Sequence, residues 1–172
     1  MQHRDRLTGF TVFKDGVRKM GIADITLPDI EYMVEPMKGT GIAGEVDMLN
    51  PGNISAMSTT INWRTINEDL TEFAQPKAHK IECFGAIQKY DSGSGELTIQ
   101  QARLAMRVLP KKIGLGKFEN NATTDSSNEF GVDYIKLTLD GVTKIEIDQF
   151  NNIFVVDDVD YLAKTRAALG LA

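Results

Sequence analysis

The sequence predicts a mainly β domain, a β-sandwich or barrel-like fold with one short flanking helix and a second helix at the C-terminus. Apolar and polar residues alternate with a period of two in several segments, which is the pattern of half-buried strands. Asp-Gly pairs, prolines and glycine-rich stretches separate these segments and favour hairpins. The 172 residues suit one domain that spans the whole chain, residues 1–172.

The clearest hairpin extends from Val132 to Phe150. Its two halves alternate apolar and polar side chains on either side of Asp140-Gly141, a two-residue turn that suits the positive φ angles of a type I′ connection. The apolar positions are Ile135, Leu137, Leu139, Val142, Ile145 and Ile147. One face of this hairpin should therefore belong to the core, and the other should be polar.

Four further strands are expected in the first part of the chain, over residues 7–13, 21–27, 29–37 and 55–64. Asp15-Gly16 closes the first of them, and Pro28 ends the second. The fourth has a strict period of two, which predicts one buried face. The residues on that face are Met57, Thr59, Ile61 and Trp63.

Two helices are expected. A short amphipathic helix should span residues 66–75, because residues 65–68 have the spacing of a capping box. Towards the C-terminus, a strand over residues 151–156 should lead into a final helix that Asp157 or Asp158 caps. The side chains on the apolar face of that helix are Val159, Leu162, Ala163 and Leu169.

A second hairpin should join residues 79–90 to residues 96–109 through a polar, flexible turn. Its second strand changes the parity of its apolar residues. Leu97 and Ile99 occupy odd positions, whereas Leu104 and the apolar residues after it occupy even positions. This switch predicts either a β-bulge or a change of packing partner along the strand.

Two long loops are expected, at about residues 36–53 and 111–128, because the first is rich in glycine and the second is polar. Loops longer than about 12 to 15 residues are uncommon in compact domains and usually have a function or are disordered. We expect the second loop to be mobile in an isolated subunit. Both are candidate contact surfaces.

Composition excludes several classes of protein. The formal charge of −5 argues against a general DNA or RNA binder, which needs a basic face. The single cysteine, Cys83, suits a reducing compartment and is expected as a small apolar strand residue. Neither a secretory signal nor a membrane span is expected, since no apolar run has the required length. Synthesis in the host cytoplasm is the corresponding expectation.

The sequence has only weak matches to motifs for nucleotide binding, metal binding or catalysis. Residues 39–44 match the glycine fingerprint of dinucleotide-binding proteins, but Asn50-Pro51-Gly52 leaves no room for the helix that must hold the phosphates. The two histidines, His3 and His79, suggest no metal cluster, and the aspartates near residue 158 lack the ligand spacing of a calcium loop. We expect no catalytic residue, no cofactor and no metal.

The C-terminal run from Tyr134 to Leu171 resembles the end of the major tail tube protein of contractile-tailed phages and phage-tail-like bacteriocins. The resemblance depends on the Asp140-Gly141 hairpin, on residues 145–148 followed by asparagines, and on residues 159–171. Residues 21–28 and the Lys38–Gly41 segment are similar to an early strand and a glycine loop of that family. Together these segments cover about half of the chain.

The resemblance implies a phage tail tube-like fold and a structural role. Six copies would form a ring, and rings would stack into a hollow inner tube that conducts DNA or punctures a target envelope. Implied partners are further copies of the chain and the sheath, tape-measure, baseplate and tail-terminator proteins, with transient passage of DNA without specific binding. The implied location is the tail of a virion or a tail-like particle.

The two long loops are the expected ring-stacking contacts. The residues concerned are Lys38, Gly39, Thr40, Gly41, Ile42, Gly44, Gly114, Gly116, Lys117, Asn120 and Asn121. The alternative is a monomeric β-sandwich module that binds a receptor or a glycan. Such a module would stay a small discrete species at high concentration, whereas a tube subunit would form rings or filaments.

Overall fold

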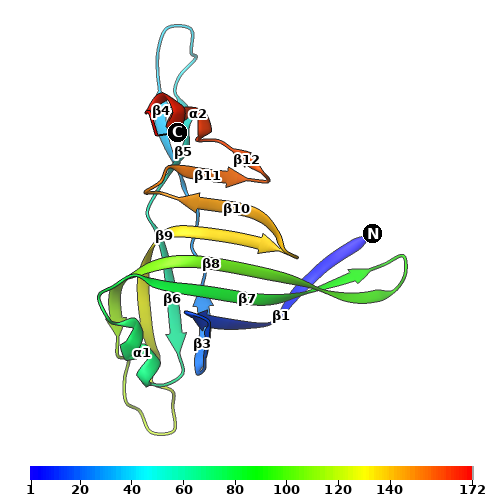
Figure 1. Ribbon diagram of the computed structural model, residues 1–172, viewed down its shortest axis with the longest axis vertical. Coiled ribbons are helices and arrows are strands. Elements are labelled where there is room, and N and C mark those ends of the chain that lie inside the picture. Colours follow the sequence, from blue (N-terminus) through cyan, green and yellow to red (C-terminus); the bar gives the residue numbers. More distant parts are fainter. Residues whose placement is uncertain (172) are drawn as a thin grey trace.

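The computed structural model describes residues 1–171 and confirms a mainly β fold with two short helices (Figure 1). The elements, in chain order, are β1 (Gln2–Lys14), β2 (Val17–Lys19), β3 (Ile22–Thr26), β4 (Tyr32–Met37), β5 (Val46–Ile54), β6 (Met57–Trp63), α1 (Glu68–Phe73), β7 (His79–Asp91), β8 (Glu96–Gly114), β9 (Ser126–Leu139), β10 (Val142–Asp148), β11 (Ile153–Val156), β12 (Val159–Asp160) and α2 (Ala163–Ala168).

The main sheet is antiparallel and has the strand order β12-β11-β10-β9-β8-β7-β1-β2. Strand β9 divides it. The N-terminal half of β9 pairs with β6, from Trp63 opposite Ser126 to Met57 opposite Val132, and its C-terminal half pairs with β10. Strand β3 pairs with the other edge of β6. The sheet therefore folds over itself at β9, which gives the barrel-like shape and two layers for a core.

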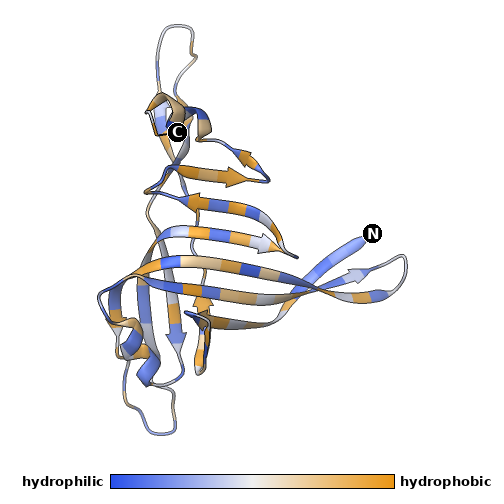
Figure 2. Ribbon diagram, in the orientation of Figure 1, coloured by the Kyte–Doolittle hydropathy of each residue, from blue (hydrophilic) through white to orange (hydrophobic). Residues whose placement is uncertain are grey.

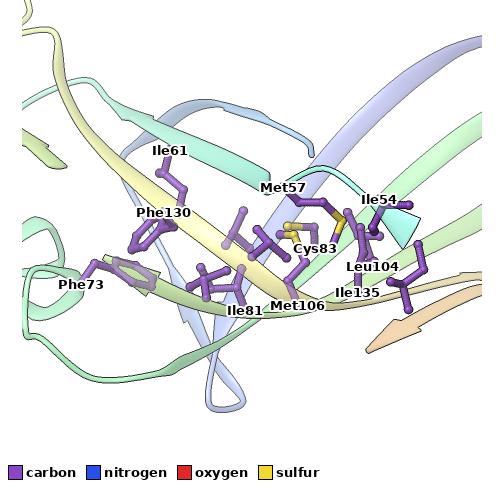
Figure 3. Close-up of a cluster of buried hydrophobic side chains, with 14 of the residues drawn as sticks. Ile54, Met57, Ile61, Phe73, Ile81, Cys83, Leu104, Met106, Phe130 and Ile135 are labelled. Atoms are coloured by element: carbon purple, nitrogen blue, oxygen red, sulfur yellow. The ribbon is translucent and has the colours of Figure 1, made fainter. Parts of the chain in front are cut away.

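The core lies between these two layers of the sheet (Figure 3). The predicted buried face of β6 is confirmed, since its side chains alternate between buried and less buried positions along the strand. Helix α1 closes one end of the core with Leu70 and Phe73, both fully buried. Phe73 packs edge-on against Phe130 of β9, with ring centroids 5.6 Å apart. A buried hydrogen bond from Trp63 Nε1 to Asn128 Oδ1, 2.8 Å, satisfies the indole in this apolar setting.

The predicted hairpin around residues 140 and 141 is confirmed as β9–β10. Asp140 and Gly141 have φ angles of 49° and 80°, as a type I′ turn requires. The ladder shifts register between Thr143 and Ile145, so that Ile145 lies opposite Leu137. This bulge explains the irregular spacing of apolar residues after the turn, because it returns the second strand to the core face.

The second hairpin is also confirmed, as β7–β8, but the alternative of a β-bulge at the parity switch is wrong. The pairing runs without a shift from Asp91 opposite Glu96 to His79 opposite Val108. What changes is the neighbouring strand, because β8 pairs with β9 only from Ala102 onward. Leu97 and Ile99 consequently lie beyond the core, and their exposed fractions are 63% and 62%.

The first strand is longer than predicted. β1 begins at Gln2 and pairs with β7 along almost its whole length, with two register shifts between Arg4 and Gly9. Backbone pairing along β7 thus extends the strand into a polar segment that shows no alternation of its own. The short strand β2, which pairs with the end of β1, was not predicted.

The two long loops are shorter than predicted because regular strands occupy their ends. In the first, β4 ends at Met37 and β5 begins at Val46, so residues 38–45 alone connect them. Pro51 and Gly52 lie within β5, where the register of the β4–β5 pair shifts. Proline has no backbone N–H, and it is tolerated there because the ladder of hydrogen bonds is interrupted at the bulge. In the second loop, residues 115–125 connect β8 to β9.

The caps of both helices differ from the predictions. Asn67, not Thr65, caps α1, and its side-chain oxygen accepts a hydrogen bond from the backbone N–H of Leu70. Asp157 and Asp158 do not cap α2. They form the turn between β11 and β12, with φ angles of 47° and 65°. None of the helical residues of α2 is buried, and the apolar anchor of this end is Leu162, just before the helix.

Across residues 1–171, the structure has no helix that combines the length and the apolar character needed to cross a membrane.

Candidate assembly surfaces

The β4–β5 hairpin is the largest feature that the core does not cover. It forms a two-stranded sheet of its own, and all six residues of β4 are exposed. Apolar pairs lie on both of its faces: Val34 opposite Leu49 on one, and Met37 opposite Val46 on the other. Their exposed fractions are between 43% and 50%. An isolated two-stranded hairpin is marginally stable in water at best, so these faces favour packing against another surface.

The base of this hairpin is anchored firmly to the main sheet. Tyr32 packs against Phe154 of β11, with ring centroids 5.9 Å apart. Gly52 has a φ angle of 79°, and a Cβ atom there would overlap the side chain of the buried Leu162. The backbone N–H of Ser55 donates to the carbonyl of Glu31 at 2.8 Å. The hairpin therefore projects from a fixed root.

The tip of the hairpin carries the first group of sequence-predicted contact residues, Lys38, Gly39, Thr40, Gly41, Ile42 and Gly44. Gly41 and Gly44 have φ angles of 92° and 97°, and open space surrounds both. A strand follows residue 45, so the helix that a dinucleotide site would need does not follow the glycines. The segment is suited to contact through its backbone and its few side chains.

The second group of predicted contact residues lies on the 115–125 loop and its β8 end. These are Gly114, Gly116, Lys117, Asn120 and Asn121. The base of the loop is tied down, because Lys117 N–H donates to the carbonyl of Thr124 at 2.8 Å and Thr124 N–H donates to the carbonyl of Arg64 at 3.0 Å. Its tip exposes 89% of Phe118.

The structure does not bring these two groups together. Figure 1 is drawn with the longest axis of the molecule vertical, and the hairpin tip and the 115–125 loop lie at its two opposite ends. Two uncovered ends with different residues suit contacts between unlike surfaces of successive copies.

Sequence reasoning missed two features of these surfaces. One is the strand structure of residues 46–54, which Pro51 and Gly52 concealed. The other is the outer part of the β7–β8 hairpin with the start of β1, which projects from the sheet (Figures 1 and 2). The parity switch at Leu97 and Ile99 was the signal for the second feature. No comparable signal marked the first.

A charged cluster fixes α1 against the β1–β2 turn. Lys14 Nζ lies 2.7 Å from Glu72 Oε1, and Lys19 Nζ lies 2.8 Å from Glu72 Oε2. Asp69 accepts a further bond from Lys19 at 3.0 Å. The hydrogen bonds from Lys14 and Lys19 lower the pKa of Glu72 to about 2. The cluster is structural, since it joins a helix to a hairpin across the surface of the core.

The residues considered for chemistry are placed as follows. His3 lies on β1, and His79 is buried at the start of β7, where burial lowers its pKa and its Nε2 lies 3.0 Å from the carbonyl of Gln75. Cys83 is a buried strand residue, as predicted, and burial raises the pKa of its thiol to about 12. Within the described residues, no group of three or more His, Cys, Asp or Glu side chains is arranged to hold a metal ion.

Comparisons with known proteins agree with these features. The family model for phage tail tube protein FII matches residues 4–170. The tail tube protein of Escherichia phage P2 is 28% identical over 171 residues, which cover 96% of this chain and 97% of the phage protein. Among solved structures, the sheath/tube terminator of the extracellular contractile injection system PVC, in its extended state, shares the fold with a TM-score of 0.57. The identity there is 12%, over 79% of this chain and 97% of the terminator.

Proposed function

The chain belongs to the phage tail tube protein FII family, and on this premise we propose that it forms homohexameric rings that stack into the hollow inner tube of a contractile tail. The family match confirms the resemblance that the sequence suggested, and the chain is a structural tail tube protein. The alternative of a monomeric receptor- or glycan-binding module has no support from the match.

The observation that carries the stacking proposal is the position of the two predicted contact groups. The glycine-rich hairpin tip and the 115–125 loop lie at opposite ends of the long axis (Figure 1). If that axis runs along the tube, the tip of one copy reaches the loop end of a copy in the next ring. Such a contact is heterologous, so a growing stack keeps the hairpin tips free at one end and the 115–125 loops free at the other.

The exposed apolar surface supplies the energy for this association. In the free subunit, Val34, Leu49 and Phe118 expose apolar surface to water. A contact that covers this surface is stabilised by roughly 25 cal/mol per Å² of apolar area buried. The anchored bases of both segments reduce the ordering cost on association, because a preformed surface loses less conformational entropy than a disordered one.

The tube would serve as a conduit or as a puncturing rod. The net charge of −5 suits a conduit for DNA, because an acidic wall does not retain the phosphate backbone. The same charge suits a bacteriocin tube that carries no DNA. Partners would be sheath, tape-measure, baseplate and tail-terminator proteins. Subunits would be made in the host cytoplasm and would end in a virion tail or tail-like particle.

Electron microscopy of the purified chain at increasing concentration tests the proposal. We expect rings with six-fold symmetry and, at higher concentration, tubes of uniform diameter. Sedimentation velocity on the same samples should show a small species at low concentration and large species at high concentration. A single small species at all concentrations in both measurements would contradict assembly.

A further inference from the structure

The projecting part of the β7–β8 hairpin is unexplained by the stacking contacts. We define the ribbon as residues 84–102 of β7 and β8 together with Gln2–Thr11 of β1. Its strands pair from Tyr90 opposite Leu97 on one side and from Gln2 opposite Asp91 on the other, where two register shifts interrupt the pairing between Arg4 and Gly9. The sheet continues into the ribbon, which projects to one side (Figure 1), and none of its residues belongs to the buried hydrophobic cluster of the described chain.

The ribbon is preformed. The backbone N–H of Ser92 donates to the carbonyl of Met1 at 3.0 Å, and Asp91 Oδ1 accepts from the backbone N–H of Gly93 at 2.8 Å. Lys89, near the tip, reaches back towards the root, where its Nζ lies 3.7 Å from the Asp140 carboxylate. These contacts hold the tip and the root in one conformation, so docking the ribbon would cost little ordering entropy.

One face of the ribbon carries an apolar knob. Ile99 lies opposite Gln88, and Leu97 lies opposite Tyr90, so the two apolar side chains and the tyrosine ring share that face. Leu97 and Ile99 expose 63% and 62% of their surface. Large apolar side chains on a rigid element resemble the anchors that contribute most of the binding energy at protein interfaces.

The same chain has an apolar groove where the ribbon joins the sheet. Its volume is about 380 Å³, and its apolar lining includes Leu7, Phe10, Ile25, Leu27, Ile87 and Leu137. Strand β3 forms one wall, and Leu27 just after it is 50% exposed. The chain thus presents a knob and a groove on different surfaces, which is the arrangement of a head-to-tail contact between copies.

Charge supports a second copy as the occupant of the groove. The stretch from Ile22 to Glu31 beside the groove carries three carboxylates, Asp24, Asp29 and Glu31, and no lysine or arginine. The ribbon together with Met1 carries four positive groups, Arg4, Arg6, Lys89 and the N-terminal ammonium group, against three carboxylates, Asp5, Asp91 and Glu96. Opposite charges on the two surfaces steer them together and fix their orientation.

We infer that the ribbon of one copy docks with its Leu97 and Ile99 face in the groove beside β3 of a neighbouring copy. The inference deepens the proposed assembly and rests on it, because it assigns the side-to-side contact that a ring needs. It also accounts for the parity switch in β8: apolar residues before position 100 face the neighbour, whereas those after it face the core of their own subunit.

The first test replaces the knob. The double variant Leu97→Ser/Ile99→Ser should remain folded by circular dichroism, yet its critical concentration for ring formation should rise roughly a hundredfold, because two buried apolar anchors are lost. The control is Val17→Ser/Met20→Ser, which alters two residues with exposed fractions of 60% and 63% outside the ribbon and the groove. It should assemble as the unmodified chain does.

The second test identifies the partner surface. A chain with Ile99→Cys and a separate chain with Leu27→Cys are mixed as free subunits, allowed to assemble and oxidised. We expect a disulfide-linked dimer on a non-reducing gel from this mixture and none from Ile99→Cys mixed with Val17→Cys. The buried thiol of Cys83 should not react in either mixture.

The outcomes separate the two proposals. If the unmodified chain forms rings but the knob variant forms them at the same concentration, or if the Ile99→Cys and Leu27→Cys chains do not cross-link, the ribbon contact is overturned and the assembly stands. If the unmodified chain forms no ring or tube, the proposed function and the ribbon contact fail together.

Discussion

The layer around Phe73 and the β4–β5 hairpin both consist of paired strands with apolar side chains, but only the first is covered. In the first, apolar side chains of the neighbouring strands β6 and β9 lie on one face of the sheet and α1 packs over them, so Phe73 and Phe130 are fully buried. In the second, Val34 and Leu49 lie on one face and Met48 lies on the other, and all three are exposed. An apolar face on a strand therefore does not specify what covers it. Whether the chain itself or a neighbour covers that face depends on tertiary placement.

This difference separates folding from assembly. The covered layer should determine the stability of the subunit, and the uncovered projections should determine how subunits associate. Matched substitutions in the two regions therefore test whether the stability of the free subunit depends on the covered layer alone.

Phenylalanine truncation should give the largest contrast. Phe73→Ala should lower the free energy of unfolding by about 3–5 kcal/mol, because it leaves a cavity between α1 and β9. Phe118→Ala, at a side chain that is 89% exposed, should change it by less than about 0.5 kcal/mol. Urea titration monitored by circular dichroism measures both. Equal losses would mean that the 115–125 loop belongs to the folded core.

Glycine replacement tests the root of the hairpin against its tip. Gly52→Ala should destabilise the subunit by about 1–3 kcal/mol, because the residue has a positive φ angle and its new Cβ would overlap Leu162. Gly44→Ala has a similar backbone strain but open space around it, so its cost should be smaller. The difference between the two thermal unfolding midpoints isolates the contact with Leu162. If the midpoints match, the hairpin root is not packed as described.

Acid should weaken the cluster that joins α1 to the β1–β2 turn. The pKa of Glu72 is lowered from 4.5 to about 2, so its contribution is fully present above pH 4.5 and is lost as the pH falls towards 2. The side chain of Glu72 is 39% exposed, and solvent screening limits the contribution to about 1 kcal/mol or less. Urea unfolding of the unmodified chain and of Glu72→Gln at several pH values measures it.

The matched control for that measurement is Glu119→Gln. Glu119 lies 3.0 Å from Lys117, but both side chains are at least 60% exposed. This variant should keep the acid dependence of the unmodified chain, whereas Glu72→Gln should lose part of it. The same acid dependence in both variants would assign the effect to other carboxylates.

The sequence predicted local structure well where one residue pattern has one physical solution. Asp140-Gly141 suits a type I′ turn because both residues accept a positive φ angle, and the turn was found. Aspartates at 157 and 158 have two uses, as helix caps and as residues with positive φ, and the sequence cannot choose between them. The structure shows the turn. The pairing of β11 with β12 selects it.

The assembly surfaces could be predicted only in part. Glycine content located the 38–45 tip, because a segment without apolar anchors has no core of its own to form. The strands on either side were missed, since Pro51 and Gly52 usually interrupt a strand and here occupy a register shift. Leu97 and Ile99 are exposed because β9 ends opposite Ala102 and does not extend alongside them. The end of β9 is set by the turn after Leu139, which is far from Leu97 and Ile99 in the sequence.

Deletion of the hairpin tip should have a small effect on the subunit and a large effect on the tube. Removing Gly39 to Gly44 takes away five exposed residues and the half-buried Ile42, none of which belongs to the core cluster, so the free energy of unfolding should change by less than about 1 kcal/mol. Growth of long tubes should nevertheless stop, because the proposed contact with the next ring is lost, while single rings should still form through other surfaces. Electron microscopy and urea unfolding of the same sample measure the two effects.

Hydrogen exchange sharpens this last prediction on the unmodified chain. Backbone amides at the tips of the 38–45 and 115–125 segments should exchange quickly in the free subunit and slowly in the assembled tube, whereas amides of Ile135 to Leu139 should be protected in both, since β8 and β10 flank them. Tubes of normal length from the deletion variant, or protection of both loops already in the free subunit, would place the stacking contact elsewhere. The uncovered faces of β4 and β5 would then be the next surfaces to alter, because they lie at the same end of the molecule and expose apolar side chains without the tip.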